Sequence, residues 1–251
     1  MISILASIAL VHTYGYKPSQ VERFKVKVEL EGWIPLFGGR EGTSTVDMLV
    51  EARVKGVSTD GTISMESEII EMSASAFGAK LPLNSSNIGQ FFPKAVVEFS
   101  PVGKVLKNSA PAIKMPVQLP GLDSQRLPEI SYLPIELGSD KYEFVRTFNG
   151  NKMTYVVLAD GEDYKFALAQ KSTGFEDAYG NPAEEADAKA GVTTELRGEG
   201  EAEFNTTSGF FSKVSVKTTA VSDVKPFGNR PAVKRTLTTK LTILHQADRN
   251  K

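Results

Sequence analysis

The residue types best suited to catalysis are few in this chain and poorly placed for it. Histidine occurs only at His12 and His245, and cysteine is absent. His12 belongs to the N-terminal segment, and His245 lies near the end of the last expected strand, on the parity of its apolar face. A histidine there is typical of a satisfied edge position. We therefore expect no Ser-His-Asp or Cys-His catalytic arrangement, no thiolate metal site and no disulfide.

Carboxylates are the remaining candidates for acid–base chemistry. Glu199, Glu201 and Glu203 recur at every second residue of an expected strand, and a pair of carboxylates can hydrolyse a glycosidic bond. Like charges at this spacing favour a solvated face instead. The cluster at 160–163 lacks the ligand set of a calcium loop, and the cluster at 184–187 is interpreted as a solvated loop. We expect a protein that is not an enzyme, without cofactor or metal site.

The same strand has a second face that is unusually small. Between the glutamates lie Gly198, Gly200 and Ala202, flanked by Leu196 and Phe204. Glycine in a strand marks a bend or close approach, or leaves room for a ligand inside a curved sheet, and both interpretations stay open. Inward aromatic residues would line either a packed core or a cavity. The candidate ligand-binding residues are Phe24, Tyr142, Phe144, Tyr164, Phe166, Gly198, Gly200 and Ala202.

Alternation of polar and apolar residues recurs along the whole chain and predicts its fold. Segments 21–31, 43–55 and 193–204 alternate cleanly, and 210–221 and 233–245 follow the last of these as a meander. Asp60-Gly61, Asn149-Gly150 and Asp160-Gly161 are strong hairpin turns. The fold class expected is mainly β, a long antiparallel meander forming a curved sheet, half-barrel or barrel with little helix.

Proline density divides the chain into two halves. The segment 108–140 carries Pro111, Pro116, Pro120, Pro128 and Pro134, a density that neither helices nor central strands tolerate. We expect a single β domain over 17–251, or two β halves, 17–107 and 141–246, joined by this connector. Segment 1–16 is expected to be a signal peptide.

The N-terminal expectation rests on an apolar run of about ten residues from Ile2 to Val11, too short to span a bilayer. It lacks a preceding Lys or Arg and a clean small-x-small cleavage site, so a buried first strand or helix stays open as the alternative. The rest of the chain has no membrane-spanning segment. Net charge is −1 and hydrophobic residues make up 41%, with no basic block for nucleic acid. We expect a secreted or periplasmic protein.

This outline, an exported chain of long meandering strands with a Pro-rich crossover, resembles the bacterial periplasmic lipoprotein-carrier and related half-barrel proteins, or an uncharacterised exported β-rich family. The resemblance implies a curved sheet that binds acyl chains or other apolar ligands. The leading hypothesis is a non-enzymatic extracytoplasmic binding protein for a lipid or apolar molecule. The alternative is a structural or protein-interaction module of the cell envelope, acting through loops such as 32–42 or 171–191.

Overall fold

The computed structural model describes residues 12–34, 39–81, 89, 92–109, 133–136, 139–148, 151–180 and 182–246. These residues form thirteen strands and a single 3-10 turn. The elements are β1 (Val21–Ile34), β2 (Arg40–Val57), β3 (Ile63–Ala76), β4 (Ala79–Lys80), β5 (Ala95–Phe99), β6 (Val105–Asn108), β7 (Lys141–Phe148), β8 (Asn151–Asp160), β9 (Asp163–Glu176), β10 (Pro182–Ala183), η1 (Glu185–Asp187), β11 (Ala190–Asn205), β12 (Phe210–Val224) and β13 (Val233–His245).

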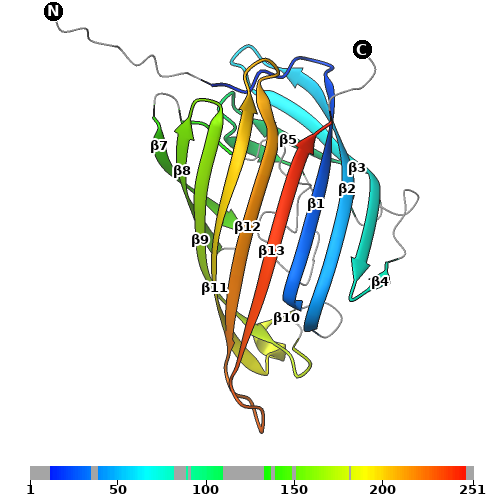
Figure 1. Ribbon diagram of the computed structural model, residues 1–251, viewed down its shortest axis with the longest axis vertical. Coiled ribbons are helices and arrows are strands. Elements are labelled where there is room, and N and C mark those ends of the chain that lie inside the picture. The colour runs from blue at the N-terminus through cyan, green and yellow to red at the C-terminus, as the bar shows by residue number, and fades with distance from the viewer. Residues whose placement is uncertain are drawn as a thin grey trace, which may run out of the picture.

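All of these strands belong to one antiparallel sheet, as Figure 1 shows. The strand order is β6-β5-β3-β2-β1-β13-β12-β11-β9-β8-β7, with β4 on β3 and β10 on β9. The first and last long strands, β1 and β13, are neighbours, so the N-terminal and C-terminal halves of the chain continue one another. Among the described residues the end strands β6 and β7 do not pair, and the sheet stays open. The predicted fold class, a curved antiparallel meander with little helix, is confirmed.

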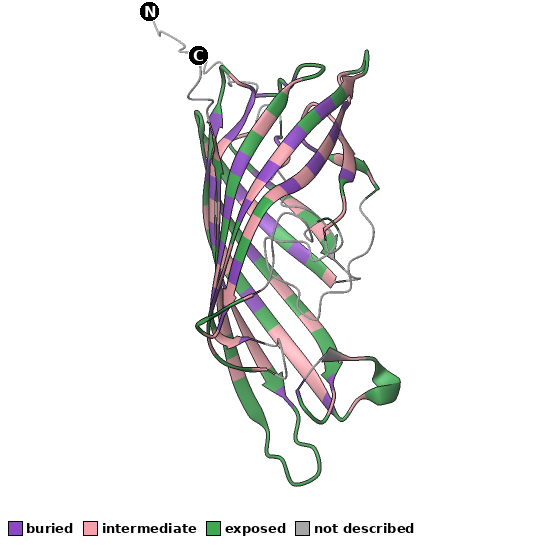
Figure 2. Ribbon diagram, turned by 90° about the vertical axis from the view of Figure 1, so that its right-hand side faces the viewer, coloured by how far each residue is buried: buried purple, intermediate pink, exposed green. Residues whose placement is uncertain are grey.

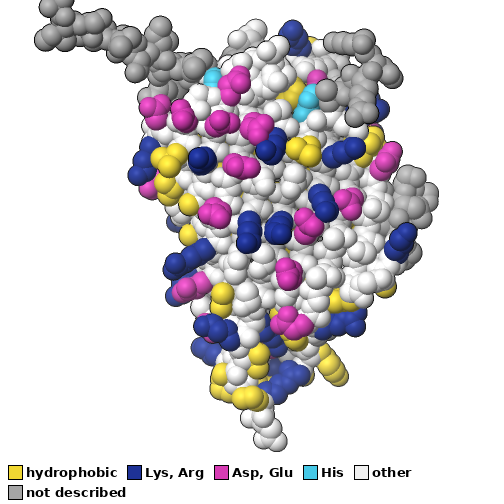
Figure 3. All heavy atoms as spheres, viewed as in Figure 1, with side chains coloured by type: hydrophobic (Ala, Val, Ile, Leu, Met, Phe, Trp, Pro, Cys, Tyr) yellow, Lys and Arg dark blue, Asp and Glu magenta, His cyan; other side chains and the backbone are white. Residues whose placement is uncertain are grey.

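The alternation of the sequence gives the sheet two unlike faces. On β1 the side chains of Phe24, Val26, Val28 and Leu30 are buried, while the intervening residues are charged, with Lys25 and Lys27 exposed and Glu29 half-buried. The sheet curves, and the edge-on view of Figure 2 shows a concave side and a convex side. Charged side chains of both signs spread over the convex face in Figure 3. Apolar side chains therefore gather on the concave face, because each strand turns the same parity inward.

Two of the predicted hairpin turns lie within the described residues and have the expected geometry. Gly61 between β2 and β3 has φ +81°, and Gly161 between β8 and β9 has φ +60°. Asp60 Oδ1 accepts hydrogen bonds from the Ser58 hydroxyl and from Thr62 N, which fixes the first turn. Glycine takes these left-handed conformations without a Cβ clash. The third predicted turn, Asn149-Gly150, lies outside the described residues.

The structure corrects two predicted loops. Segment 32–42 was expected to be a loop, but β1 continues to Ile34 and β2 begins at Arg40, with Gly32 opposite Gly42. Segment 171–191 was expected to be a polar excursion, but β9 continues through it to Glu176. Main-chain pairing with neighbouring strands therefore extends into both segments, although one is largely apolar and the other polar. Within the same segment, residues 185–187 form the 3-10 turn η1.

Within the described residues, no helix is long and apolar enough to cross a membrane. The described part of the Pro-rich connector includes 133–136, where Leu133 and Ile135 are buried. Ile135 N donates a hydrogen bond of 2.7 Å to Val102 O, which attaches this segment to the loop between β5 and β6. The connector therefore contributes at least two side chains to the core of the sheet.

Candidate ligand-binding face

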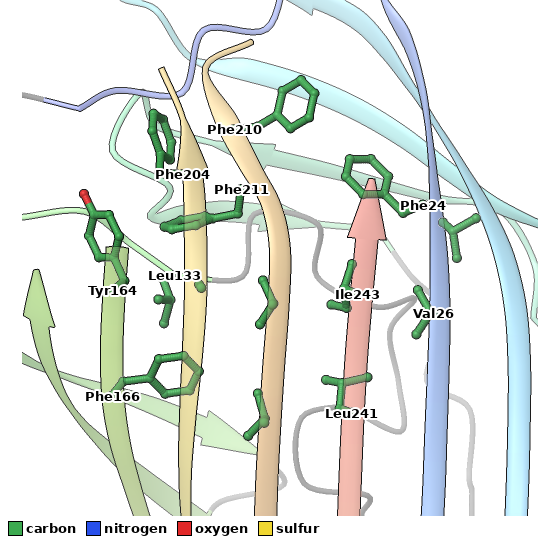
Figure 4. Close-up of a cluster of buried hydrophobic side chains, with 14 of the residues drawn as sticks. Phe24, Val26, Leu133, Tyr164, Phe166, Phe204, Phe210, Phe211, Leu241 and Ile243 are labelled. Carbon is green, nitrogen blue, oxygen red and sulfur yellow. The ribbon is translucent and has the colours of Figure 1, made fainter. Parts of the chain in front are cut away.

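The middle of the concave face is aliphatic. Every side chain of two adjacent cross-strand rows is buried, with no more than 3% of its surface exposed. Figure 4 shows Ile243 and Leu241 of β13 beside Val26 of β1. These apolar rows run from β1 through β13 to β12 as Val26–Ile243–Val214 and Val28–Leu241–Val216.

An aromatic cluster closes the upper end of this face, where β1 begins and β13 ends (Figure 4). The segment 12–16, which we call the N-terminal strap, contributes Tyr14 and Tyr16. The Tyr14 ring meets Phe99 edge-on at 5.6 Å between centroids, and the Tyr16 ring stacks on Phe210 at 5.1 Å. Such arrangements are the favourable ones for aromatic pairs. The other members of the cluster are Phe24, Phe204 and Phe211.

Main-chain hydrogen bonds hold the N-terminal strap against two loops. Tyr14 N donates to Pro101 O at 2.7 Å, and Gly15 N donates to Gly209 O at 2.8 Å. Gly209 follows β11 with φ +74°, and a Cβ on it would lie 2.6 Å from the Cα of Gly15. The His12 ring stacks on Phe204, and its Nδ1 lies 2.8 Å from the Tyr164 hydroxyl. Residues 12–16 of the expected signal peptide are thus packed into the folded domain.

Buried tyrosine hydroxyls connect the sheet to the 133–136 segment. The Tyr14 hydroxyl donates to Leu133 O, and the Tyr142 hydroxyl donates to Pro134 O, each at 2.7 Å. Burial raises the pKa of Tyr14 and of Tyr142 well above the ordinary value, and burial raises the pKa of Tyr164 to about 12. The three hydroxyls therefore remain neutral at neutral pH, and those of Tyr14 and Tyr142 donate to the main chain.

The predicted ligand-binding residues all lie on the concave face but do not form one group. The structure brings together Tyr164 and Phe166 of β9 with the small residues of β11, since Tyr164 is opposite Ala202 and Phe166 is opposite Gly200. A Cβ on Gly200 would lie 2.3 Å from Phe166 Cζ, so the Phe166 ring occupies the space over this glycine. Gly198 lies against the Thr218 methyl group in the same way.

The other three predicted residues lie elsewhere on the face. Tyr142 and Phe144 belong to the end strand β7, where Phe144 stacks on Tyr155 of β8 at 4.5 Å. Tyr155 in turn lies 6.3 Å from Phe166, which continues the aromatic series to β9. Phe24 is separated from β11 by β12 and β13 and belongs to the upper aromatic cluster. The aromatic residues thus lie at the upper end of the aliphatic centre and along its β7–β9 side.

A row of hydroxyl groups crosses the concave face directly below the apolar rows. Thr218 and Thr239 are register partners on β12 and β13, and Leu30 of β1 separates Thr239 from Ser44 of β2. Their exposed fractions are 2%, 1% and 4%, respectively. None of the three hydroxyl oxygens has a hydrogen-bond partner in the described part of the chain. We call Ser44, Thr218 and Thr239 the hydroxyl row.

Sequence reasoning missed the hydroxyl row, although its parity was visible. Thr239 falls between Leu237 and Leu241 at alternate positions, and Thr218 continues the series of Val214 and Val216. A threonine on the apolar parity of a strand marks a polar group turned toward the core. A buried hydroxyl without a partner costs about 1–3 kcal/mol. Three such groups in one row therefore carry a combined free-energy cost that the fold of the free chain does not offset with hydrogen bonds among its described residues.

Two pairs of polar side chains lie in the lower part of the concave face. Thr194 and Ser222 share a hydrogen bond of 2.8 Å between their hydroxyls. Arg235 of β13 forms an ion pair with Glu176 of β9, and Nη1 lies 2.5 Å from Oε2. The side chains are only 13% and 7% exposed, and the Arg235 guanidinium lies 4.2 Å from the centre of the Trp33 ring. Because β12 and β11 lie between β13 and β9, this pair spans the lower end of the concave face.

The glutamates that could serve as catalytic groups are on the opposite side. Glu199, Glu201 and Glu203 are exposed on the convex face, and Glu203 pairs with Lys213 at 2.7 Å. Such surface pairs contribute little to stability. Across the ranges that the structure describes, no three His, Asp or Glu side chains are grouped as metal ligands would be. His245 lies at the upper rim, where its Nε2 bonds to the Glu22 carboxylate, as expected of an edge histidine.

Comparison with known proteins yields a likeness of fold. No protein-family model matches the chain, and no curated protein matches it. The structure described as "Lipid-protein interactions in lipovitellin" aligns with 93% of this chain and 26% of its own, with a TM-score of 0.51 and 9% identity. This chain therefore spans about a quarter of that protein. The structure of DynF from the dynemicin biosynthesis pathway of Micromonospora chersina aligns over 95% of this chain and 86% of its own, at a TM-score of only 0.24 and 7% identity.

At 9% identity the likeness to lipovitellin concerns the fold alone. It supports the coarser part of the resemblance expected from the sequence, a β-rich chain folded as a long curved sheet. The concave face has three zones: an aromatic upper end, an aliphatic centre and a polar lower end, with the hydroxyl row between the last two.

Proposed function

We propose that this protein is a non-enzymatic extracytoplasmic binding protein whose ligand is a lipid or another apolar molecule held on the concave face. The observation that carries the proposal is the zoned concave face of an open sheet, with aliphatic rows bordered by aromatic side chains at the upper end and on the β7–β9 side. Covering apolar surface contributes roughly 25 cal/mol per Å². The side chains of these rows are no more than 3% exposed in the chain alone, so an elongated apolar ligand would bind by replacing the contacts that now cover them.

The likeness of fold to lipovitellin supports the proposal by analogy. It covers 93% of this chain, and the compared structure is described by its lipid–protein interactions. Fold alone is a weak warrant for function, so the weight rests on the side chains of the concave face. The lower ion pair of Arg235 with Glu176 would limit an apolar ligand at one end, and the aromatic cluster would limit it at the other.

The proposed location outside the cytoplasm rests on the apolar run from Ile2 to Val11. His12, Tyr14 and Tyr16 are buried in the upper aromatic cluster, with 4–5% of each exposed. Removing them would open the end of the face and leave Leu133 O without the Tyr14 hydroxyl. We therefore place signal-peptide cleavage before His12. Sequencing the N-terminus of the exported protein tests this, and a mature chain beginning after Tyr16 would contradict it.

A second candidate function, a structural or protein-interaction module of the envelope, is favoured by the open end of the sheet at β7. In the described residues β7 pairs only with β8. Val145 of β7 is 55% exposed and Leu158 of β8 is 51% exposed, both on the convex side. An unpaired edge strand with apolar side chains offers a partner both main-chain and apolar contacts.

Displacement of a fluorescent hydrocarbon probe distinguishes the two functions. The apolar-ligand proposal predicts that the probe brightens on binding and that long-chain lipids displace it. The interface variant Val145→Lys/Leu158→Lys should leave this binding unchanged. If the probe does not bind while Val145→Lys/Leu158→Lys abolishes a protein complex, the second function replaces the first.

A further inference from the structure

We propose that the hydroxyl row binds the uncharged hydrogen-bonding group of an amphipathic lipid, a hydroxyl or ester, whose hydrocarbon chain lies on the apolar rows above. This inference rests on the proposed function and specifies its ligand class. It starts from Ser44, Thr218 and Thr239, which are buried on the concave face without a hydrogen-bond partner in the described residues.

The strand register places two of the three hydroxyl-bearing residues side by side. Thr218 and Thr239 are directly opposite one another on adjacent strands. A threonine hydroxyl both donates and accepts, so the pair can hold an oxygen that also donates and accepts. One row lower on β9, Gln170 adds a buried Nε2 donor that also lacks a partner in the part of the chain described. Among these unpartnered groups, Thr218 and Thr239 are in register on adjacent strands, so they are the two positioned to share one polar atom of a ligand.

Charge limits what that atom can belong to. From β9 to β2, the hydroxyl row and the two apolar rows above it contain no charged inward side chain among the described residues. Below them, Arg235 and Glu176 already neutralise each other. A carboxylate or phosphate placed at the hydroxyl row would be buried without a counter-ion, which is costly. A neutral hydroxyl or ester carries no such penalty.

The length of the face above the hydroxyl row suits a single hydrocarbon chain. Thr239 and Ile243 are four positions apart on β13, which corresponds to about 14 Å along the strand. One leaflet of a bilayer has a hydrocarbon depth of roughly 15 Å. An amphiphile anchored at Thr239 would therefore reach the upper aromatic cluster with an ordinary acyl chain.

The test compares three ligands of equal chain length on the full-length protein: 1-dodecanol, dodecane and dodecanoate at pH 8, each displacing the same hydrocarbon probe. Wild-type protein should bind dodecanol about tenfold more tightly than dodecane, as expected for one hydrogen bond in a buried site. Dodecanoate should bind no better than dodecane.

The informative variant is Thr218→Val/Thr239→Val, which removes two hydroxyls and keeps the shape of both side chains. It should bind dodecane as before and lose the preference for dodecanol. The matched control is Thr219→Val/Thr238→Val, a register pair on the same two strands that faces the convex side. The control should keep the tenfold preference.

Each outcome decides a different claim. If dodecanol and dodecane bind wild-type protein equally well, water satisfies the hydroxyl row and this inference fails while the proposed function stands. A preference for dodecanoate, or a dodecanol preference that survives in Thr218→Val/Thr239→Val, also overturns the inference. If neither the probe nor any of the three ligands binds the folded protein, the proposed function itself is wrong.

Discussion

Replacing Thr218 and Thr239 of the hydroxyl row with valine should make the ligand-free protein more stable. Threonine to valine exchanges a hydroxyl for a methyl group of nearly the same size, so no cavity forms. Thr218 and Thr239 are 2% and 1% exposed, and neither hydroxyl has a partner in the residues that the structure describes. The substitution therefore removes a desolvation penalty without removing a hydrogen bond, which reverses the usual sign of a core substitution.

The size of the gain follows from the cost of a buried hydroxyl. Mutational data give about 1–3 kcal/mol for an unpartnered group, and we take the low end of about 1 kcal/mol for each threonine. The two sites are in contact, so their effects need not add, and about 2 kcal/mol is an upper expectation for the pair. For a domain of this size that corresponds to a rise of about 4–8 °C in Tm.

Urea unfolding followed by circular dichroism measures the change as a shift of midpoint at constant slope. The control is Thr194→Val on the same face, whose hydroxyl bonds to Ser222 at 2.8 Å. It should lose about 1 kcal/mol, because Ser222 is left without its partner. If Thr218→Val and Thr239→Val are each as destabilising as Thr194→Val, the hydroxyl row is hydrogen-bonded in the free protein and the reasoning fails.

Three further perturbations test the two ends of the concave face. Gly209→Ala should destabilise the protein by about 2 kcal/mol or more in urea unfolding, because φ is +74° and the new Cβ would meet Gly15. The control Gly161→Ala isolates the cost of the positive φ, because a Cβ on Gly161 would have no atom within 4 Å. Glu176→Ala should cost about 3–5 kcal/mol by leaving the Arg235 charge buried and unpaired, and an effect below 1 kcal/mol would show that water reaches the pair. Burial raises the pKa of Tyr164 from 10.0 to about 12, so the unfolded chain loses this proton first; its stabilising contribution is complete below pH 10 and decreases between pH 10 and 12. Absorbance titration of phenolate should therefore show a late step that Tyr164→Phe removes.

Local alternation was sufficient to predict the sheet and most of its inward residues. Phe24, Val26 and Val28 could be assigned to the buried face because alternate residues of a strand share one face. A shift of one residue would expose all three, so the apolar pattern determines which face is buried. The turn at Asp60-Gly61 was predictable because its chemistry is contained in neighbouring residues. These features depend on residues that are close together in the sequence, so local patterns are enough to predict them.

Pairing between distant segments was not predictable in the same way. The contact of β1 with β13 joins residues more than two hundred positions apart and decides that both halves belong to one sheet. Glu176 is buried because it pairs with Arg235 of another strand. That partner is not visible in the local sequence, so the polar composition of 171–191 suggested a loop. Tyr14 packs against Phe99 and Leu133 O, partners that the apolar run before it gave no means to identify.

The same distinction holds for the candidate site: the inward direction of its residues was predictable, but their contacts across strands were not. The sequence identified Gly198 and Gly200 as small inward residues but could not show that Phe166 lies over Gly200. It contained the parity of Thr218 and Thr239, yet only the cross-strand register shows that the two residues are directly opposite one another. The chemistry of a sheet face is a property of rows across strands, and a row is visible only once the strands are paired.

The most direct test of the central claim is native mass spectrometry of the protein released from its producing cells without detergent. We expect a reproducible added mass that extracts into organic solvent as a neutral amphiphilic lipid, carried by a chain whose N-terminus lies at or before His12. A bare polypeptide that also fails to acquire 1-dodecanol when the alcohol is supplied in excess would contradict it.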